Sequence, residues 1–213
     1  TTVGDSFGGA NTALYFDGAS YIELADSADW DFGTGDWTWE AWINCATKSS
    51  SHGVWAHRAD DNNRYQVYID NTGKFGVYSS YGGTILYSTG TNNQLRDETP
   101  IKDNTWEHWS IVSTSASAHT LYRNGVAVIT LDPAASLTGI GGVLRIGHRH
   151  DGSYFTGYMD QFRISKGIAR YGSTSLRTTQ QVVTSSNSDS QVVTSNSTFG
   201  SGTNLFTADA NTA

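Results

Sequence analysis

The stretch 155-FTGYMDQFRIS-165 decides the fold, because its side chains alternate with a period of two residues. If this stretch is extended, one of its faces carries Tyr158, Asp160, Phe162 and Ile164. Gln161 and Arg163 point the other way, so the pattern predicts a β-strand with one face in a core. A carboxylate on an apolar strand face costs several kcal/mol unless it is compensated. Asp160 is therefore predicted to be a fixed structural member or part of a site.

A second stretch near the N-terminus, 14-LYFDGASYIEL-24, reads as strand, Asp-Gly turn and strand. The clearest alternation of the chain follows, with Trp37, Trp39, Ala41 and Ile43 on one face and Trp42 as the exception. Further strands are expected at 53–56, 64–70, 74–79, 84–87, 105–113, 119–123, 126–131, 143–146 and 155–165. About a dozen strands without a convincing helix predict two packed antiparallel sheets.

The composition agrees with an all-β chain of 213 residues that has many short strands and glycine turns. It contains 23 Gly, 11 Tyr, 7 Trp and only 2 Pro. The net charge of −7 disfavours nucleic acid or an anionic membrane as the main partner, since either would select a Lys/Arg-rich surface. The single cysteine, Cys45, excludes an intrachain disulfide. We see no signal peptide and no apolar run of membrane-spanning length, so no membrane insertion is expected.

Six motifs in order carry a resemblance to a known family: ALYFDGASYIEL, WTWEAWI, WEHWSIV, TLYRNGVAV, LRIGH and FTGYMDQFRISKGIARY. Over roughly residues 10–172 the chain resembles a laminin-G-like domain of the concanavalin A-like lectin/glucanase superfamily, in a form met in phage and marine viral structural proteins. The resemblance implies a two-sheet antiparallel jelly-roll sandwich for residues 1–172.

The remaining part, residues 173–213, is predicted to be an extended C-terminal arm. It is rich in Ser, Thr, Asn and Gln, a composition that buries too little apolar surface to fold alone. A pentapeptide recurs in it, as 181-QVVTS-185 and 191-QVVTS-195. The residues Gln181, Val182, Val183, Gln191, Val192 and Val193 have the β-propensity to add a strand to an exposed sheet edge. The alternative is a tail that wraps its own sandwich.

Catalysis is not expected. Glycoside hydrolysis needs two carboxyl groups at a defined separation, and the Glu-x-Asp-x-Glu pattern of the glucanases of this fold is missing from the sequence. Glu40 and Glu107 each lie between tryptophans. They could form a pair across a cleft, but the favoured interpretation is that each is hydrogen-bonded or faces solvent. The chain also lacks a Gly-x-Ser-x-Gly elbow, a P-loop and a dinucleotide fingerprint.

The sequence offers candidate ligands for two kinds of cation, a transition metal and calcium, and does not by itself establish a cofactor. His148, His150 and Asp151 offer ligands to a transition metal, but a structural zinc site needs four ligands and no cysteine is near, so a solvated loop is favoured. The resemblance makes calcium more plausible, since relatives often bind one calcium at a sandwich rim, and calcium takes oxygen ligands. Asp17 and Asp160 are the calcium candidates. Alternatively, the Asp160 carboxylate accepts hydrogen bonds from a loop or pairs with an arginine.

Carbohydrate binding needs aromatic faces beside polar groups that fix a sugar's orientation. The rim loops offer such a mixture, and the candidates taken from them are Trp55, His57, Arg58, Asp60, Tyr78 and Tyr81. The opposing interpretation is that most of the aromatic residues fill the core of the sandwich.

Together these features predict a non-enzymatic phage virion protein, for example a capsid decoration or a tail-fibre component, that displays a lectin-like domain with weak host-glycan binding. Its expected partners are other virion subunits, reached through the arm, and further copies of itself in a homo-oligomer. The rival hypothesis is a secreted or cell-surface carbohydrate-binding module, with or without calcium.

Overall fold

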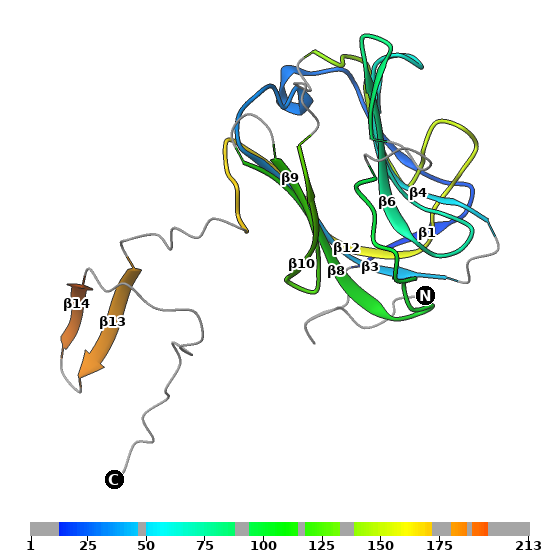
Figure 1. Ribbon diagram of the computed structural model, residues 1–213. Coiled ribbons are helices and arrows are strands. Elements are labelled where there is room, and N and C mark those ends of the chain that lie inside the picture. Colours follow the sequence, from blue (N-terminus) through cyan, green and yellow to red (C-terminus); the bar gives the residue numbers. More distant parts are fainter. Residues whose placement is uncertain are drawn as a thin grey trace. The chain divides into compact units, whose positions relative to one another are not determined.

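The computed structural model describes residues 13–46, 50–87, 94–114, 118–132, 139–171, 180–186 and 189–195. The chain divides into two compact units, Thr1–Gly172 and Ser173–Ala213. The first unit is a sandwich of two six-stranded sheets, seen as two layers in Figure 1. This confirms the predicted all-β jelly-roll class. In the described part of the chain, no helix is long and apolar enough to cross a membrane.

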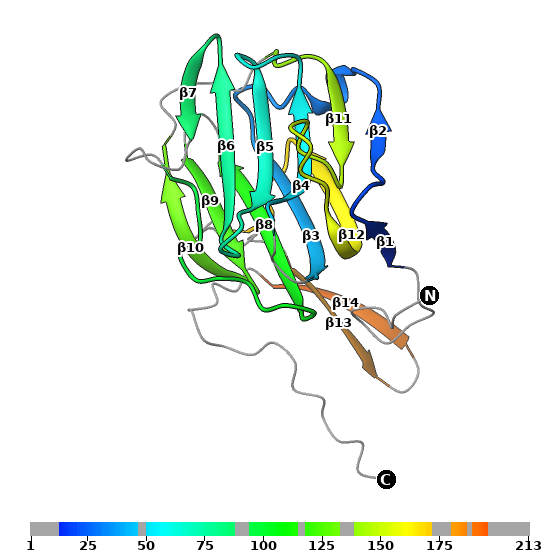
Figure 2. The ribbon, with the colours of Figure 1, turned by 90° about the vertical axis from the view of Figure 1, so that its right-hand side faces the viewer.

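The first sheet contains the strands that carry the site. Its order is β1 (Leu14–Asp17), β12 (Thr156–Lys166), β3 (Trp37–Cys45), β8 (Trp106–Thr114), β9 (Ala118–Arg123) and β10 (Val126–Leu131). The second sheet faces the viewer in Figure 2, with the order β2 (Ile22–Leu24), β11 (Val143–Ile146), β4 (His52–Arg58), β5 (Arg64–Ile69), β6 (Phe75–Tyr81) and β7 (Thr84–Tyr87). A 3-10 turn, η1 (Ala28–Trp30), follows β2.

The core lies between the sheets and consists largely of aromatic rings. The four β3 side chains predicted to face inward, Trp37, Trp39, Ala41 and Ile43, are all at most 2% exposed. The Phe75 ring stacks on Trp109 with centroids 4.1 Å apart, and Trp39 lies 5.9 Å from Trp55 across the interface. The period-two prediction for this strand is therefore confirmed.

Strand β12 departs from the predicted alternation. Its register pairs Asp160 with Trp42 and Arg163 with Glu40, so Gln161 and Phe162 together oppose one residue of β3. This β-bulge reverses the alternation after Asp160. Met159, rather than Asp160, faces the core, and Asp160 shares the outer face with Tyr158 and Arg163. The predicted common face for Tyr158, Asp160, Phe162 and Ile164 was wrong because sequence periodicity does not reveal an inserted residue.

The second unit contains two described strands, β13 (Gln180–Ser186) and β14 (Asp189–Ser195). They pair with each other in an antiparallel register that sets Val182 opposite Val193 and Val183 opposite Val192. The two copies of the repeated pentapeptide therefore form one hairpin. Pairing with another sheet edge, and the assembly role that depends on it, stay predictions.

One titratable side chain, His119, is buried in the core of the sandwich. His119 is 4% exposed and lies against the rings of Trp37, Tyr65 and Tyr87. Burial lowers its pKa from the ordinary 6.5 to about 4. The ring is therefore neutral in the folded protein at pH 7.

We predict that the sandwich loses stability as the pH falls from about 6.5 to about 4. In this window, between the ordinary pKa of 6.5 and the folded-state pKa of about 4, the unfolded chain binds a proton at His119 and the folded chain does not, which costs about 3 kcal/mol. The shape-conserving variant His119→Phe should change the free energy of unfolding at pH 7 by less than about 1.5 kcal/mol. Urea unfolding from pH 7 to pH 4.5 tests this, and equal pH slopes for both proteins would contradict it.

Candidate functional site

The first sheet has an outer face, which is the side turned away from the second sheet. The side chains of β3 that alternate with its core residues point there, namely Thr38, Glu40, Trp42 and Asn44. The segment 168–171 crosses part of this face. The Thr38 hydroxyl donates to the carbonyl of Ile168 at 2.8 Å and accepts from the Arg170 amide at 2.9 Å. Thr38 is 0% exposed as a result, although it faces away from the core.

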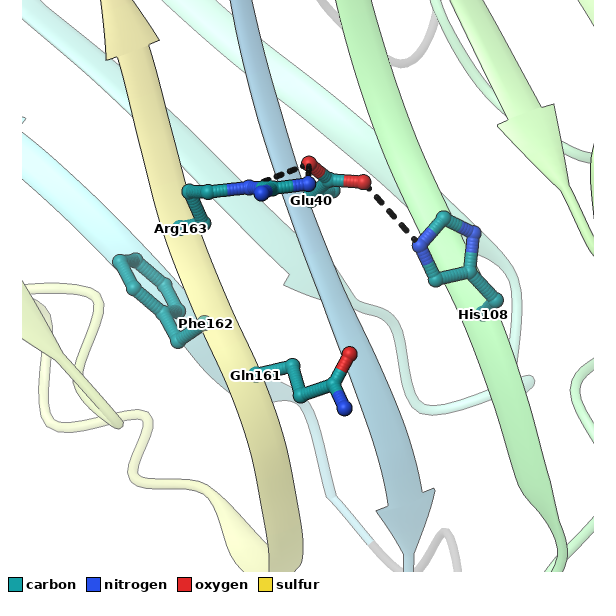
Figure 3. A pocket seen from close by; sticks show the side chains of 5 residues that line it. All are labelled: Glu40, His108, Gln161, Phe162 and Arg163. Atoms are coloured by element: carbon teal, nitrogen blue, oxygen red, sulfur yellow. Dashed lines mark hydrogen bonds and ion pairs between the residues drawn. The ribbon is translucent and has the colours of Figure 1, made fainter. Parts of the chain in front are cut away.

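Beside this segment the face is hollowed. Two overlapping hollows of about 310 and 400 Å³ open at the bulge of β12 and share Glu40, His108, Gln161 and Arg163. Their remaining lining residues are Trp42, Asn124, Gly125, Phe162 and Tyr171. Figure 3 shows Arg163 reaching from β12 to Glu40 on β3, with His108 on β8 at the other side of the carboxylate.

The Glu40 carboxylate is the centre of the hollow. It is buried, at 4% exposed, and each of its oxygens has a partner. Oε1 accepts from Nε of Arg163 at 2.7 Å and also from Nη2, and Oε2 accepts from the Tyr171 hydroxyl at 2.6 Å. Burial alone would raise the pKa of Glu40, but the hydrogen bonds from Tyr171 and Arg163 outweigh it and lower that pKa. Glu40 is therefore ionised at neutral pH.

Two neighbours of Glu40 keep their neutral forms. Nε2 of His108 lies 3.5 Å from Oε2 of Glu40. Burial nevertheless lowers the pKa of His108 against the opposing charge of Glu40, so the ring is neutral at pH 7. Burial and the hydrogen bond to Glu40 raise the pKa of Tyr171 to about 12. The hollow thus offers one fixed negative charge, the Arg163 guanidinium and several neutral polar groups.

The bulge that opens the hollow holds its backbone in an unfavourable conformation. Gln161 has a φ of 50°, a left-handed value that costs a residue with a side chain roughly 1–2 kcal/mol. Oδ1 of Asp160 accepts the Gln161 amide at 2.7 Å and so stabilises the bulge. The Gln161 side chain is exposed and projects over β3, as Figure 3 shows. Strain of this kind is concentrated at functional sites.

We predict that Gln161→Gly raises the free energy of unfolding by about 1 kcal/mol, because glycine adopts this φ without a steric penalty. The same substitution at Val126, an exposed position on edge strand β10, should lower it by a similar amount through chain entropy. Chemical denaturation of both variants measures the difference. A loss of stability in Gln161→Gly as large as in Val126→Gly would show that the bulge is not strained.

The structure does not bring the two calcium candidates together. Asp17 is opposite Thr156 on β12, four residues from Asp160, a separation of about 13 Å at 3.3 Å per residue. The Asp17 carboxylate accepts the amides of Ala19 and Ser20 at 2.9 and 2.8 Å, which lower its pKa and close the β1–β2 turn. Among the described residues there is no group of three His, Cys, Asp or Glu side chains placed to hold a metal.

The rim residues proposed for sugar binding lie on or near the second sheet and are dispersed. Trp55 and His57 are 0% and 1% exposed within the core, so neither presents a ring face to a ligand, and we correct these two candidates. Arg58 forms an ion pair with Asp61 at 2.7 Å, while Asp60 accepts amides of its own turn. Tyr78 lies under the Arg64 guanidinium, and Tyr81 packs against the core.

The glutamates considered as a catalytic pair lie on opposite faces of the sheet. Glu40 points outward, whereas Glu107 is opposite the core residue Ile43 and pairs with Arg123 at 2.7 Å. In the 148–151 loop, His148 makes local contacts. Nδ1 of His148 accepts from the His150 amide at 3.3 Å, and its ring packs on Tyr154.

Comparison with known proteins agrees with this architecture. A laminin-G-like family model, described as the concanavalin A-like lectin/glucanases superfamily, matches residues 16–170. The chain belongs to this family. The resemblance seen in its motifs is thereby confirmed. No curated protein matches the chain at a significant level.

Several solved structures share the fold. Domain 4 of AbnA, an extracellular arabinanase from Geobacillus stearothermophilus solved with arabinotriose, aligns with a TM-score of 0.58 at 17% identity, over 76% of this chain and 74% of that chain. The binding domain of botulinum neurotoxin serotype G aligns with a TM-score of 0.56 at 12% identity, over 79% of this chain and 44% of that chain. Domains LG4-5 of mouse laminin α1 align with a TM-score of 0.53 at 13% identity, over 72% of this chain and 40% of that chain. At these identities the likeness establishes the fold alone.

Proposed function

We propose that the sandwich is a carbohydrate-binding domain that holds a sugar in the hollow around Glu40. The observation that carries the proposal is a buried, ionised carboxylate at the base of an open hollow, bonded by Arg163 and bordered by Trp42. Sugar hydroxyl groups exchange hydrogen bonds with charged and amide groups, and the apolar face of a sugar ring packs on an aromatic ring. A few oriented polar groups beside an apolar surface are the usual make-up of a small-ligand site.

The proposed domain is non-catalytic. Within the described part of the chain, Glu40 is the only carboxylate that lines the hollow, while glycoside hydrolysis requires two. The depressed pKa of Glu40 also makes it a poor proton donor at neutral pH. Support for binding comes from the arabinanase domain of similar fold, which was solved with a bound oligosaccharide.

We predict that the protein binds glycans and that Glu40→Gln weakens this binding by roughly ten- to a hundredfold, the effect of losing hydrogen bonds to a charged group. A glycan array finds the ligand, and calorimetry measures the affinity. Gln161→Gly is a second test, since it removes a lining side chain while relieving strain. The matched control is Glu98→Gln, an exposed glutamate in the segment between β7 and β8 that pairs with Lys74 and Arg96. Unchanged affinity in Glu40→Gln and Gln161→Gly would refute this site.

For the C-terminal unit we propose attachment of the sandwich to a neighbouring subunit, as in a virion component. The support is physical: a hairpin of two strands alone is marginally stable in water, so β13 and β14 need a further surface. Many copies of the sandwich, displayed on a virion or on a cell surface, would together bind a glycan-covered target tightly even if each copy binds sugar weakly.

Truncation after Gly172 tests this attachment. We predict that the full chain forms a larger species than the truncated chain in size-exclusion chromatography with light scattering, because only the full chain contains β13 and β14. The affinity of one sandwich for a glycan should be the same in the full and the truncated chain. Two monomers of identical behaviour would rule out an assembly role for residues 173–213.

A further inference from the structure

The outer face continues beyond the hollow as a row of side chains that contains three aromatic rings. The strand registers align Tyr15 of β1, Tyr158 of β12, Asn44 of β3 and Trp106 of β8 across four neighbouring strands. The rings of Tyr15 and Tyr158 are in contact, with centroids 5.0 Å apart. Tyr15 is 59% exposed, far more than the aromatic residues of the core. This row, defined by these four residues, is called the aromatic row below.

The aromatic row and the hollow are two ends of one surface. Along β3 the outward side chains are Glu40, Trp42 and Asn44, so the row lies about 13 Å from Glu40 at 3.3 Å per residue. Trp42 lies midway and is partly exposed, with its ring 5.3 Å from that of His108. A chain of sugar rings that leaves the hollow in this direction therefore meets Trp42 first and the aromatic row next.

In the opposite direction the surface is closed. The segment 168–171 covers Thr38, and Val112 and Ser165, its neighbours on the outer face, are 1% and 8% exposed. Towards β9, Tyr171 lies against Tyr122, which is 8% exposed, with ring centroids 5.9 Å apart. A sugar at Glu40 thus has protein beyond it on the Thr38 side and open surface on the Asn44 side.

From this asymmetry we infer that the site recognises the end of a linear oligosaccharide. The inference rests on the proposed function of the hollow and specifies its ligand. The terminal sugar occupies the hollow, where Glu40, Arg163 and Gln161 bond its hydroxyl groups. The following sugars run along β3 over Trp42 and rest on Tyr158 and Tyr15. Single sugars would use only part of this surface, and the interior of a polymer would collide with segment 168–171.

The test is calorimetry of the full chain with linear oligosaccharides of one to six sugars. Arabino-oligosaccharides and the best-binding repeat from the glycan array are the two probes. Affinity should rise by roughly tenfold or more between one sugar and three or four, and then level off. The double variant Tyr15→Ala/Tyr158→Ala should lose this gain while keeping the affinity for the single sugar. The amount of protein bound by a long polymer of the same repeat should be proportional to the number of its chain ends, not to the number of its sugar units.

The control is Tyr21→Ala, because Tyr21 is 40% exposed next to β2 on the second sheet. Thermal melting verifies that each variant is folded. If the double variant does not fold, the single variant Tyr15→Ser, which removes one ring instead of two, takes its place. Equal affinity for one sugar and for six, or equal losses in Tyr21→Ala and the double variant, would overturn the inference and leave sugar binding in place. Polymer binding proportional to sugar units would overturn recognition of the chain end. Binding of no oligosaccharide at all would refute both this inference and the proposed function.

Discussion

The packing of aromatic rings between the two sheets is the constraint on which the rest of the structure depends. Phe75 stacks on Trp109, and Trp39 lies against both Phe75 and Trp55. Because β3 must turn Trp37, Trp39, Ala41 and Ile43 towards these rings, its other side chains have to point outward. The core thereby fixes the positions of Glu40 and Trp42 although neither belongs to it.

Two irregular features convert that regular outer face into a hollow. The bulge of β12 spreads the side chains near Gln161, and segment 168–171 forms a wall through its bonds to Thr38 and Glu40. The wall also removes water from the Glu40 carboxylate, which explains why an outward-facing residue is buried. Its charge is tolerated because Arg163 and Tyr171 replace the lost water contacts.

The sequence predicted the regular parts of the molecule and missed the irregular ones. Period-two patterns found the strands and the inward face of β3, because burial on one face imposes that spacing. The site was missed because its residues come from β3, β8, β12 and a segment after the last strand of the sandwich, and only the fold unites them. One local signal existed: Trp42 breaks the alternation of its strand, as an aromatic residue kept outside the core would. Trp55 was misjudged because the short strand predicted at 53–56 shows no alternation that would mark its core face, and in the structure all four of these residues are buried.

The bulge of β12 is needed both for the packing of the core and for the geometry of the site. Without the extra residue, the alternation of β12 would continue unbroken from Met159, which is buried against the core. Arg163 would then face the core and Ile164 would face solvent, which would bury a charge and expose an apolar side chain. The inserted residue keeps Met159 and Ile164 on the core side while it turns Arg163 towards Glu40. The unfavourable backbone of Gln161 is therefore the condition under which a single strand supplies both the core and the proposed sugar site.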